Sequence, residues 1–211
     1  MTAKPVKITK KSLPSALDEL ARREPAFRRL LDDYGPPGLR TRPAGFTALV
    51  HIICGQQVST ASARAIVGRL DAAVNPLTPE NFLAFGEKGL RGVGFSGQKA
   101  RYTLGIAEAM VAGSFNPRRV AHLDDEDAIA ELTVLKGVGR WTAEIYMMFA
   151  LGRPDIWPVG DLGVVKGTMI VKGLEARPSD EEMMALAEPW RPWRSVAARM
   201  MWHALHNTPT T

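Results

Sequence analysis

The stretch LKGVGRWTA at residues 135–143 decides the fold, and PVGD at residues 158–161 follows it after an apolar segment. Two glycines flank one valine at a sharp turn between two helical patterns, and a lone carboxylate stands at the start of a third helix. Because glycine has no Cβ, backbone N–H groups at such a turn can approach a phosphate closely. The pattern predicts a helical hairpin that contacts a phosphate, with Asp161 one helix length away.

Composition sets the class of protein around this hairpin. The chain has 211 residues, is 45% hydrophobic and carries a net charge of +5, which suits a folded core and a polyanionic partner. Its single cysteine, Cys54, forms no internal disulfide and cannot ligate an iron–sulfur cluster. No signal peptide or long apolar span is visible. We therefore expect a cytoplasmic protein, nucleoid-associated if it is bacterial, with no membrane contact. We also expect a monomer.

Helical patterns run through the whole chain and predict an all-α fold. Residues 46–54 are almost wholly apolar, which predicts a central buried helix. Residues 1–11 carry four lysines and are expected to form a flexible basic arm. The other helices are expected to begin near Ser12, Pro25, Ser59, Thr78, Ser96, Asp124, Gly139, Asp161, Ser179 and Pro192.

Three further segments accompany the hairpin in a fixed order: GQQVS at residues 55–59, GFSGQKA at 94–100 and WRPWRS at 190–195. With the hairpin and Asp161, they resemble the helix-hairpin-helix (HhH-GPD) DNA glycosylases, nearest the DNA-3-methyladenine glycosylase II branch. The resemblance implies a two-lobed helical bundle with the hairpin motif, about residues 133–150, at the lobe interface. The glycosylase unit would cover residues 12–211, with helices 12–34 and 161–207 packing as the second lobe. The extra N-terminal domain of many relatives is expected to be missing.

The resemblance also implies an activity. The chain would be a monofunctional glycosylase of base excision repair that flips alkylated purines, such as 3-methyladenine and 7-methylguanine, out of double-stranded DNA. Asp161 would drive hydrolysis of the N-glycosidic bond. By position alone Asp161 is a helix N-cap, and both roles can hold. Bifunctional relatives carry a lysine at the position of Trp141, and an indole cannot form a Schiff base. No lyase activity is therefore expected.

Other site residues follow from the alignment with the family. Trp141 and Trp202 match aromatic residues of the base pocket, Ile145 stands where the family has a tyrosine, and Tyr146 is next to it. Gln57 matches the side chain that fills the gap left by the extruded base. No cofactor is expected for catalysis, although a structural Na⁺ or K⁺ would bind the carbonyls of Thr133, Leu135 and Val138. The predicted DNA contacts are Gln56, Gln57, Lys99, Lys136, Gly137, Gly139 and Arg140.

Two alternatives stay open at this point. The scaffold fits a catalytically silent module that binds lesions or duplex DNA, and it fits a glycosylase for other damaged or deaminated bases. Trp190 and Trp193 suit core packing, whereas Trp157 suits either the core or the pocket.

Overall fold

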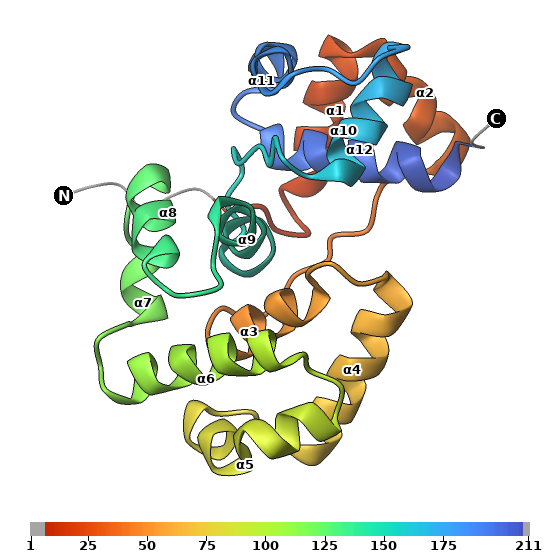
Figure 1. The fold of residues 1–211 in the computed structure, drawn as a ribbon. Helices are drawn as coiled ribbons and strands as arrows, with labels where there is room; N and C mark the ends of the chain where they lie inside the picture. The colour runs from red at the N-terminus through yellow and green to blue at the C-terminus, as the bar shows by residue number, and fades with distance from the viewer. Residues whose placement is uncertain (1–6, 209–211) are drawn as a thin grey trace. The chain divides into compact units, whose positions relative to one another are not determined.

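The structure, a computed structural model, describes residues 7–208. Within that range every regular element is helical, which confirms the all-α prediction (Figure 1). In the same range no helix is both long and apolar enough to cross a bilayer. The chain forms two compact units: one joins the residues up to Thr41 with those from Met147 onward, and the other is Arg42–Tyr146.

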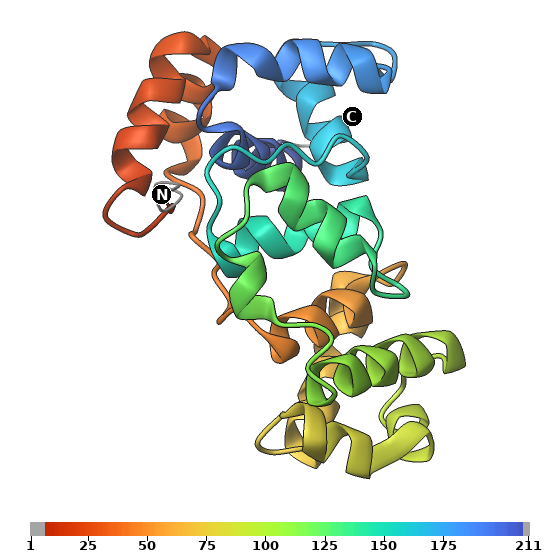
Figure 2. The same cartoon turned by 90° about the vertical axis from the view of Figure 1, so that its left-hand side faces the viewer.

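The first unit is organised around two helices, α10 (Leu162–Lys172) and α12 (Arg194–Asn207), which pack against each other (Figure 1). Figure 2 shows the N-terminal pair of helices side by side with the C-terminal part of this unit. The remaining elements are α1 (Leu13–Arg23), α2 (Pro25–Tyr34), the π-helical turn η1 (Met147–Leu151), α11 (Asp180–Ala187) and the 3₁₀ turn η2 (Glu188–Trp190).

An aromatic cluster fills the core of this unit. The Trp190 ring lies 5.5 Å from that of Phe27 and 5.4 Å from that of Trp157, measured between centroids. Trp157 is 4% exposed, and its indole N–H donates to the Met183 carbonyl at 3.1 Å. Both tryptophans are therefore core residues. This placement was expected for Trp190, and for Trp157 it decides between the core and the pocket in favour of the core.

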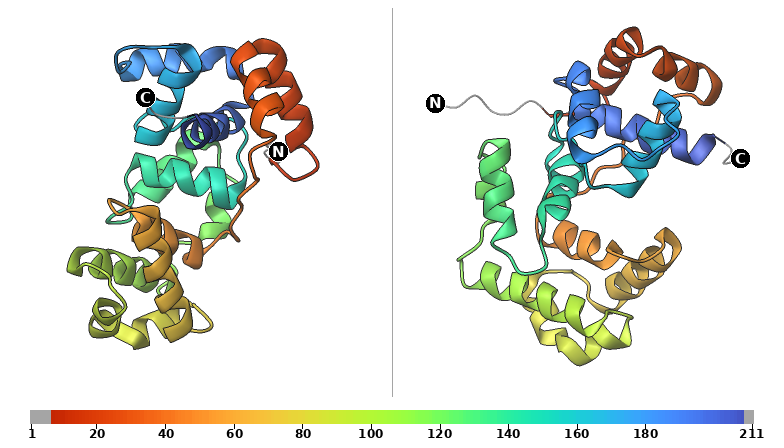
Figure 3. Two further views of the ribbon diagram at one scale, coloured as in Figure 1. Left: turned by 90° about the vertical axis from the view of Figure 1, so that its right-hand side faces the viewer. Right: turned by 45° about the horizontal axis from the view of Figure 1, so that its top comes forward.

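The second unit surrounds α3 (Phe46–Gly55), which packs on three neighbours, α4, α6 and α9. Seven side chains of α3 are buried, which confirms the prediction of a buried helix at residues 46–54. Figure 3 shows α5 and α6 side by side from two further directions. The other elements are α4 (Thr60–Ala73), α5 (Pro79–Gly92), α6 (Gly97–Val111), α7 (Pro117–Val120), α8 (Asp125–Thr133) and α9 (Arg140–Tyr146).

Helix starts follow the capping signals. Ser59, Thr78, Ser96 and Ser179 each accept a hydrogen bond from the backbone N–H three residues later, so these predicted starts are confirmed. The helix expected to begin near Gly139 is not uniform, because α9 ends at Tyr146 and residues 147–151 continue it as a π-helical turn. Just beyond this turn, the Arg153 N–H donates to the Met147 carbonyl.

The predicted basic arm needs a correction at its inner end. Residues 1–6 lie outside the described residues. Ile8, however, is 5% exposed and its N–H donates to the Gly152 carbonyl at 2.8 Å. The chain is thus attached to the first unit from Ile8 onward, because an apolar side chain and a backbone donor both find partners there.

Candidate functional site

The hairpin turn joins α8 to α9 through a glycine in a left-handed conformation. Gly137 has φ +88°, and a Cβ at this position would lie 2.3 Å from the ring of Tyr102 on α6. The Val138 N–H donates to the Leu135 carbonyl at 3.0 Å, which closes the turn. Gly139 is exposed, and a Cβ there would meet no protein atom within 4 Å. Gly137 is therefore required by the fold, whereas Gly139 leaves open space for a ligand.

Gln56 and Gln57 follow each other in the loop after α3, but one side chain is bonded within the protein and the other is exposed. Gln57 is exposed and adopts φ +52°. The Gln56 side chain is turned inward, where its amide donates to the Gly137 carbonyl at 3.2 Å and to the Thr142 hydroxyl at 2.8 Å. The Gln56 amide group is therefore used within the second unit, and the DNA contact predicted for this residue stays a prediction.

Lys99 is also engaged by this loop. Its ammonium group donates to the carbonyls of Cys54 and Gln56 at 2.8 and 2.6 Å. Burial lowers the pKa of Lys99, and the partial negative charge at the C-terminus of α3 suits a cation there. The predicted phosphate contact by Lys99 therefore competes with two short bonds that hold the loop, while Lys136 in the hairpin turn is exposed.

Arg140, a predicted DNA contact, forms ion pairs with two carboxylates of the hairpin. Its guanidinium donates two hydrogen bonds to the Glu126 carboxylate, at 2.8 and 3.1 Å, and one to Glu144 at 3.0 Å. The hydrogen bond from Arg140 lowers the pKa of Glu126. This bidentate ion pair joins α8 to α9, so Arg140 stabilises the hairpin.

Asp161 is the N-cap of α10, as its position predicted. Its Oδ1 accepts the Val164 N–H at 2.9 Å and the indole N–H of Trp202 at 2.9 Å. The carboxylate is half-buried at this helix start. Two donors from two helices thus fix the orientation of one carboxylate oxygen.

Two glycines on α10 permit this contact. A Cβ at Gly163 would lie 2.8 Å from the Trp202 ring, and a Cβ at Gly167 would lie 2.1 Å from the Met201 carbonyl oxygen. The backbones of α10 and α12 therefore approach so closely that no larger residue fits at Gly167. This packing brings the Trp202 indole to Asp161.

Trp202 packs against the Phe149 ring, which in turn packs against a buried cation. The Phe149 ring lies 5.7 Å from the Trp202 ring, and the Arg199 guanidinium lies 4.4 Å from the centre of the Phe149 ring. Arg199 is 6% exposed and donates to the Met148 carbonyl at 3.2 Å. Burial lowers the pKa of Arg199 to about 10, so the group remains a cation at neutral pH. Cation–π attraction supports this stack.

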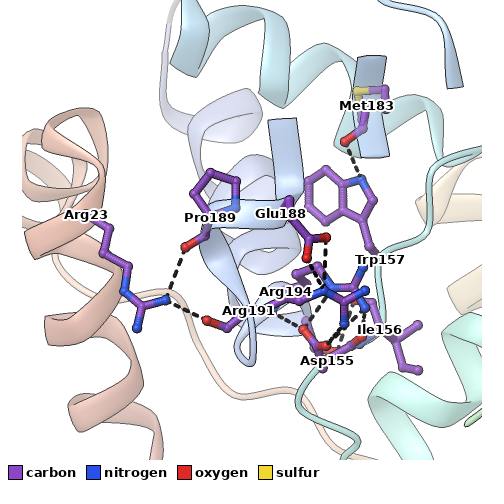
Figure 4. A network of polar contacts seen from close by, with 10 residues as sticks. Arg23, Asp155, Ile156, Trp157, Met183, Glu188, Pro189, Arg191 and Arg194 are labelled. Atoms are coloured by element: carbon purple, nitrogen blue, oxygen red, sulfur yellow. Dashed lines mark hydrogen bonds and ion pairs between the residues drawn. The ribbon is translucent and has the colours of Figure 1, made fainter. Parts of the chain in front are cut away.

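The segment before Asp161 is anchored by a charge network (Figure 4). The Asp155 carboxylate accepts from the guanidinium groups of Arg191 at 2.6 Å and Arg194 at 2.8 and 3.0 Å. The Ile156 N–H donates to the Ser195 hydroxyl at 2.9 Å. Asp155 and Ile156 are therefore bonded to the start of α12, and this fixes the chain that leads to Asp161.

Comparison with known proteins shows the family to which the chain belongs. The family described as "HhH-GPD superfamily base excision DNA repair protein" matches residues 50–192. The chain belongs to this superfamily.

Its relatives differ in length. The DNA-3-methyladenine glycosylase 1 of Schizosaccharomyces pombe is 30% identical over 192 residues, which are 89% of this chain and 83% of that protein. YfjP of Bacillus subtilis is 30% identical over 127 residues, which are 60% of this chain but 44% of the relative. A solved 3-methyladenine DNA glycosylase of S. pombe in complex with abasic DNA is 29% identical, with a TM-score of 0.80 over 89% of this chain and 95% of that one.

Within this HhH-GPD chain, the predicted pocket residues fall into both units. Trp141, Ile145 and Tyr146 belong to the second unit, and Trp202 belongs to the first. Tyr146 is fully buried and its hydroxyl accepts the Gly45 N–H at 3.0 Å, while burial raises its pKa to about 12. Its surroundings are those of a core residue. Ile145 is 9% exposed, and Trp141 is half-buried at the start of α9.

Several residues around the site carried no clear signal in the HhH-GPD sequence pattern. Phe149 and Arg199 lie within apolar runs, and only the contact of Phe149 with Trp202 and that of Arg199 with Phe149 reveal their place. Thr142 directly follows Trp141 and would have been a candidate for supporting the hairpin. Gly163 and Gly167 have the four-residue spacing of one helix face, which indicates a close helix approach.

Proposed function

We propose that this chain is a monofunctional DNA glycosylase that extrudes alkylated purines of the 3-methyladenine and 7-methylguanine type and hydrolyses their N-glycosidic bond. The observation that carries the proposal is the Asp161 carboxylate, held by the Val164 N–H and the Trp202 indole at the start of α10. Membership of the superfamily and relatives named as 3-methyladenine glycosylases support the reaction class. The proposed partner is double-stranded DNA.

The chemistry needs one carboxylate. A purine alkylated at N3 or N7 is cationic, so it leaves as a neutral base without a strong general acid. Positive charge then develops on the sugar, where the Asp161 carboxylate would stabilise it and orient the attacking water. This differs from most glycoside hydrolases, which use two carboxylates.

The proposed DNA contacts lie in the second unit. The N–H groups of Gly137 and Gly139 would bind one phosphate, assisted by Lys136, and such contacts are independent of sequence. Three backbone carbonyl oxygens are the proposed cation ligands, those of Thr133, Leu135 and Val138. They carry no formal charge, which suits a monovalent cation better than a divalent one. The Leu135 carbonyl already accepts the Val138 N–H but has a second lone pair. A cation there would support the turn and take no part in bond cleavage.

The proposal predicts two products, a free base and an intact strand with an abasic site. A lyase step needs an unprotonated amine at the sugar, and the family supplies it from the position that is Trp141 here. Alkylated duplex DNA is incubated with the protein, and released bases are separated by chromatography while strands are run on a denaturing gel. Borohydride is added in parallel to trap any Schiff base.

The expected result is release of methylated purines above the rate of spontaneous depurination, with no borohydride adduct and no strand break before alkali. Release of no base would support the silent binding module. Efficient trapping would contradict the monofunctional assignment and leave the glycosylase assignment standing.

A second prediction concerns Trp202. Trp202→Phe keeps an aromatic side chain against Phe149 but removes the hydrogen bond to Asp161, so excision should fall about fivefold, the factor set by one hydrogen bond. The loss should be the same for cationic and neutral lesions, because it acts on the carboxylate. Single-turnover rates corrected for spontaneous loss measure it. If only Trp202→Ala loses activity, and only toward cationic bases, the ring serves as a stacking wall alone.

A further inference from the structure

The loop that carries Gln57 is held in a strained conformation. Among residues 7–208, Gln57 is the only residue other than glycine with a positive φ, at +52°. Side chains with a Cβ rarely adopt this region, and such strain persists only where surrounding contacts impose it. Gln57 and Val58 are exposed at the tip of the loop, so the restraint must come from the residues beside them.

Gln56 supplies the first restraint. Both donors of its amide are used, one by the Gly137 carbonyl in the hairpin turn and one by the Thr142 hydroxyl on α9. These partners lie 81 and 86 residues further along the chain. A single side chain thus joins the loop to the turn and to the helix after it. Thr142 is 2% exposed, so its hydroxyl is fixed and shielded from water.

The helix α6 supplies the second restraint. Lys99 on α6 binds the carbonyls of Cys54 and Gln56 on the near side of the loop. Tyr102, on the same helix, lies directly against Gly137 in the hairpin turn. The loop and the hairpin therefore rest on one helix and are also joined to each other.

We infer that Gln56, Lys99 and Thr142 are positioning residues, which fix the Gln57 loop at a set place relative to the phosphate-binding hairpin. When the hairpin binds a phosphate, the position of the hairpin on the DNA strand is fixed. Because Gln56 is bonded to the Gly137 carbonyl and the Thr142 hydroxyl, the position of the neighbouring Gln57 is then fixed as well. The Gln57 side chain, which fills the gap, then lies at a constant distance along the strand from the bound phosphate. The inference rests on the proposed function, in which Gln57 occupies the space of the extruded base.

The test uses Thr142, because valine keeps the shape of its side chain without the hydroxyl and serine keeps the hydroxyl without the methyl group. Thr142→Val removes the hydroxyl that accepts from Gln56, and Thr142→Ser retains it. The probe is a duplex containing 2-aminopurine, whose fluorescence rises when the base leaves the stack. Thr142→Val should lower the extrusion signal about fivefold, the factor for one hydrogen bond, with affinity for an undamaged duplex and the melting temperature close to wild type. Thr142→Ser should restore the signal.

A double-mutant cycle shows whether the effect passes through Gln57. Gln57→Gly removes the gap-filling side chain, and glycine adopts the positive φ without strain. In this background Thr142→Val should cause no further loss of extrusion. A full fivefold loss in the Gln57→Gly background would overturn the inference. So would a fall in duplex affinity equal to the fall in extrusion, or failure of Thr142→Ser to restore the signal.

Failure of the inference and failure of the proposed function give different results. The fluorescence signal requires extrusion but no bond cleavage. A wild-type protein that extrudes 2-aminopurine and releases no alkylated base would refute the glycosylase assignment while leaving the Thr142 comparison interpretable. A wild-type protein that releases bases, with equal extrusion by the Val and Ser variants, would refute the positioning role alone.

Discussion

Asp161→Asn is expected to lower the single-turnover rate of base excision by about 10²–10⁴-fold, the range associated with loss of a positioned charge or base. The amide oxygen can still accept from the Val164 N–H and the Trp202 indole, so α10 and its packing should be retained. What is lost is the negative charge beside the sugar. Affinity for the duplex should stay within a few-fold, because phosphate contacts carry most of the binding.

Glu144 provides the comparison for this prediction. It is 4% exposed on the hairpin helix and its carboxylate accepts from Arg140, so Glu144→Gln weakens an ion pair of the hairpin and leaves the Asp161 side chain itself unchanged. Excision and duplex affinity are measured for both variants on the same alkylated DNA. If Asp161→Asn kept most of the wild-type rate while Glu144→Gln lost it, the catalytic assignment would be wrong.

Gly137→Ala is expected to cause the second large effect, a loss of DNA binding together with a loss of stability. An L-residue at φ +88° costs about 1–2 kcal/mol, and the added Cβ would also overlap the Tyr102 ring. The turn must therefore move, which displaces the N–H groups proposed to bind the phosphate. Affinity for undamaged duplex should fall at least about tenfold, with a lower free energy of unfolding.

Two other glycines separate the causes. Gly113 has φ +73°, but a Cβ added there would meet no protein atom within 4 Å, so Gly113→Ala should lower stability through backbone strain alone and leave DNA affinity intact. Gly139→Ala has room within the protein and should weaken duplex binding while melting close to wild type. Unchanged binding by both Gly137→Ala and Gly139→Ala would make the turn a simple connection between helices.

The sequence predicted those features that depend on neighbours along the chain. The caps at Ser59, Thr78, Ser96 and Ser179, the buried helix at residues 46–54 and the capping position of Asp161 all depend on local chemistry or periodicity. These elements sufficed to predict the all-α fold, whereas the family resemblance came from the hairpin, Asp161 and the three segments at residues 55–59, 94–100 and 190–195.

The directions of long polar side chains could not be predicted in this way. Gln56, Lys99 and Arg140 were all assigned to DNA from the sequence. The structure adds partners within the second unit that the sequence did not predict, and the DNA contacts stay predictions. The partners of Gln56 lie more than 80 residues away. Such a choice depends on which carbonyl or carboxylate the fold brings near, and a motif does not contain that information.

The close approach of α10 and α12 limits how Asp161 and its contact with Trp202 could be grafted onto another protein scaffold. Sliding one helix past the other by a single residue, a shift of about 1.5 Å, would carry the Trp202 indole out of reach of Asp161. Gly167, where any Cβ would meet the Met201 backbone, holds that register together with the hydrogen bond from Trp202 to Asp161. A protein engineer who wished to graft the carboxylate onto another scaffold would have to move both helices as one part, with their glycines intact.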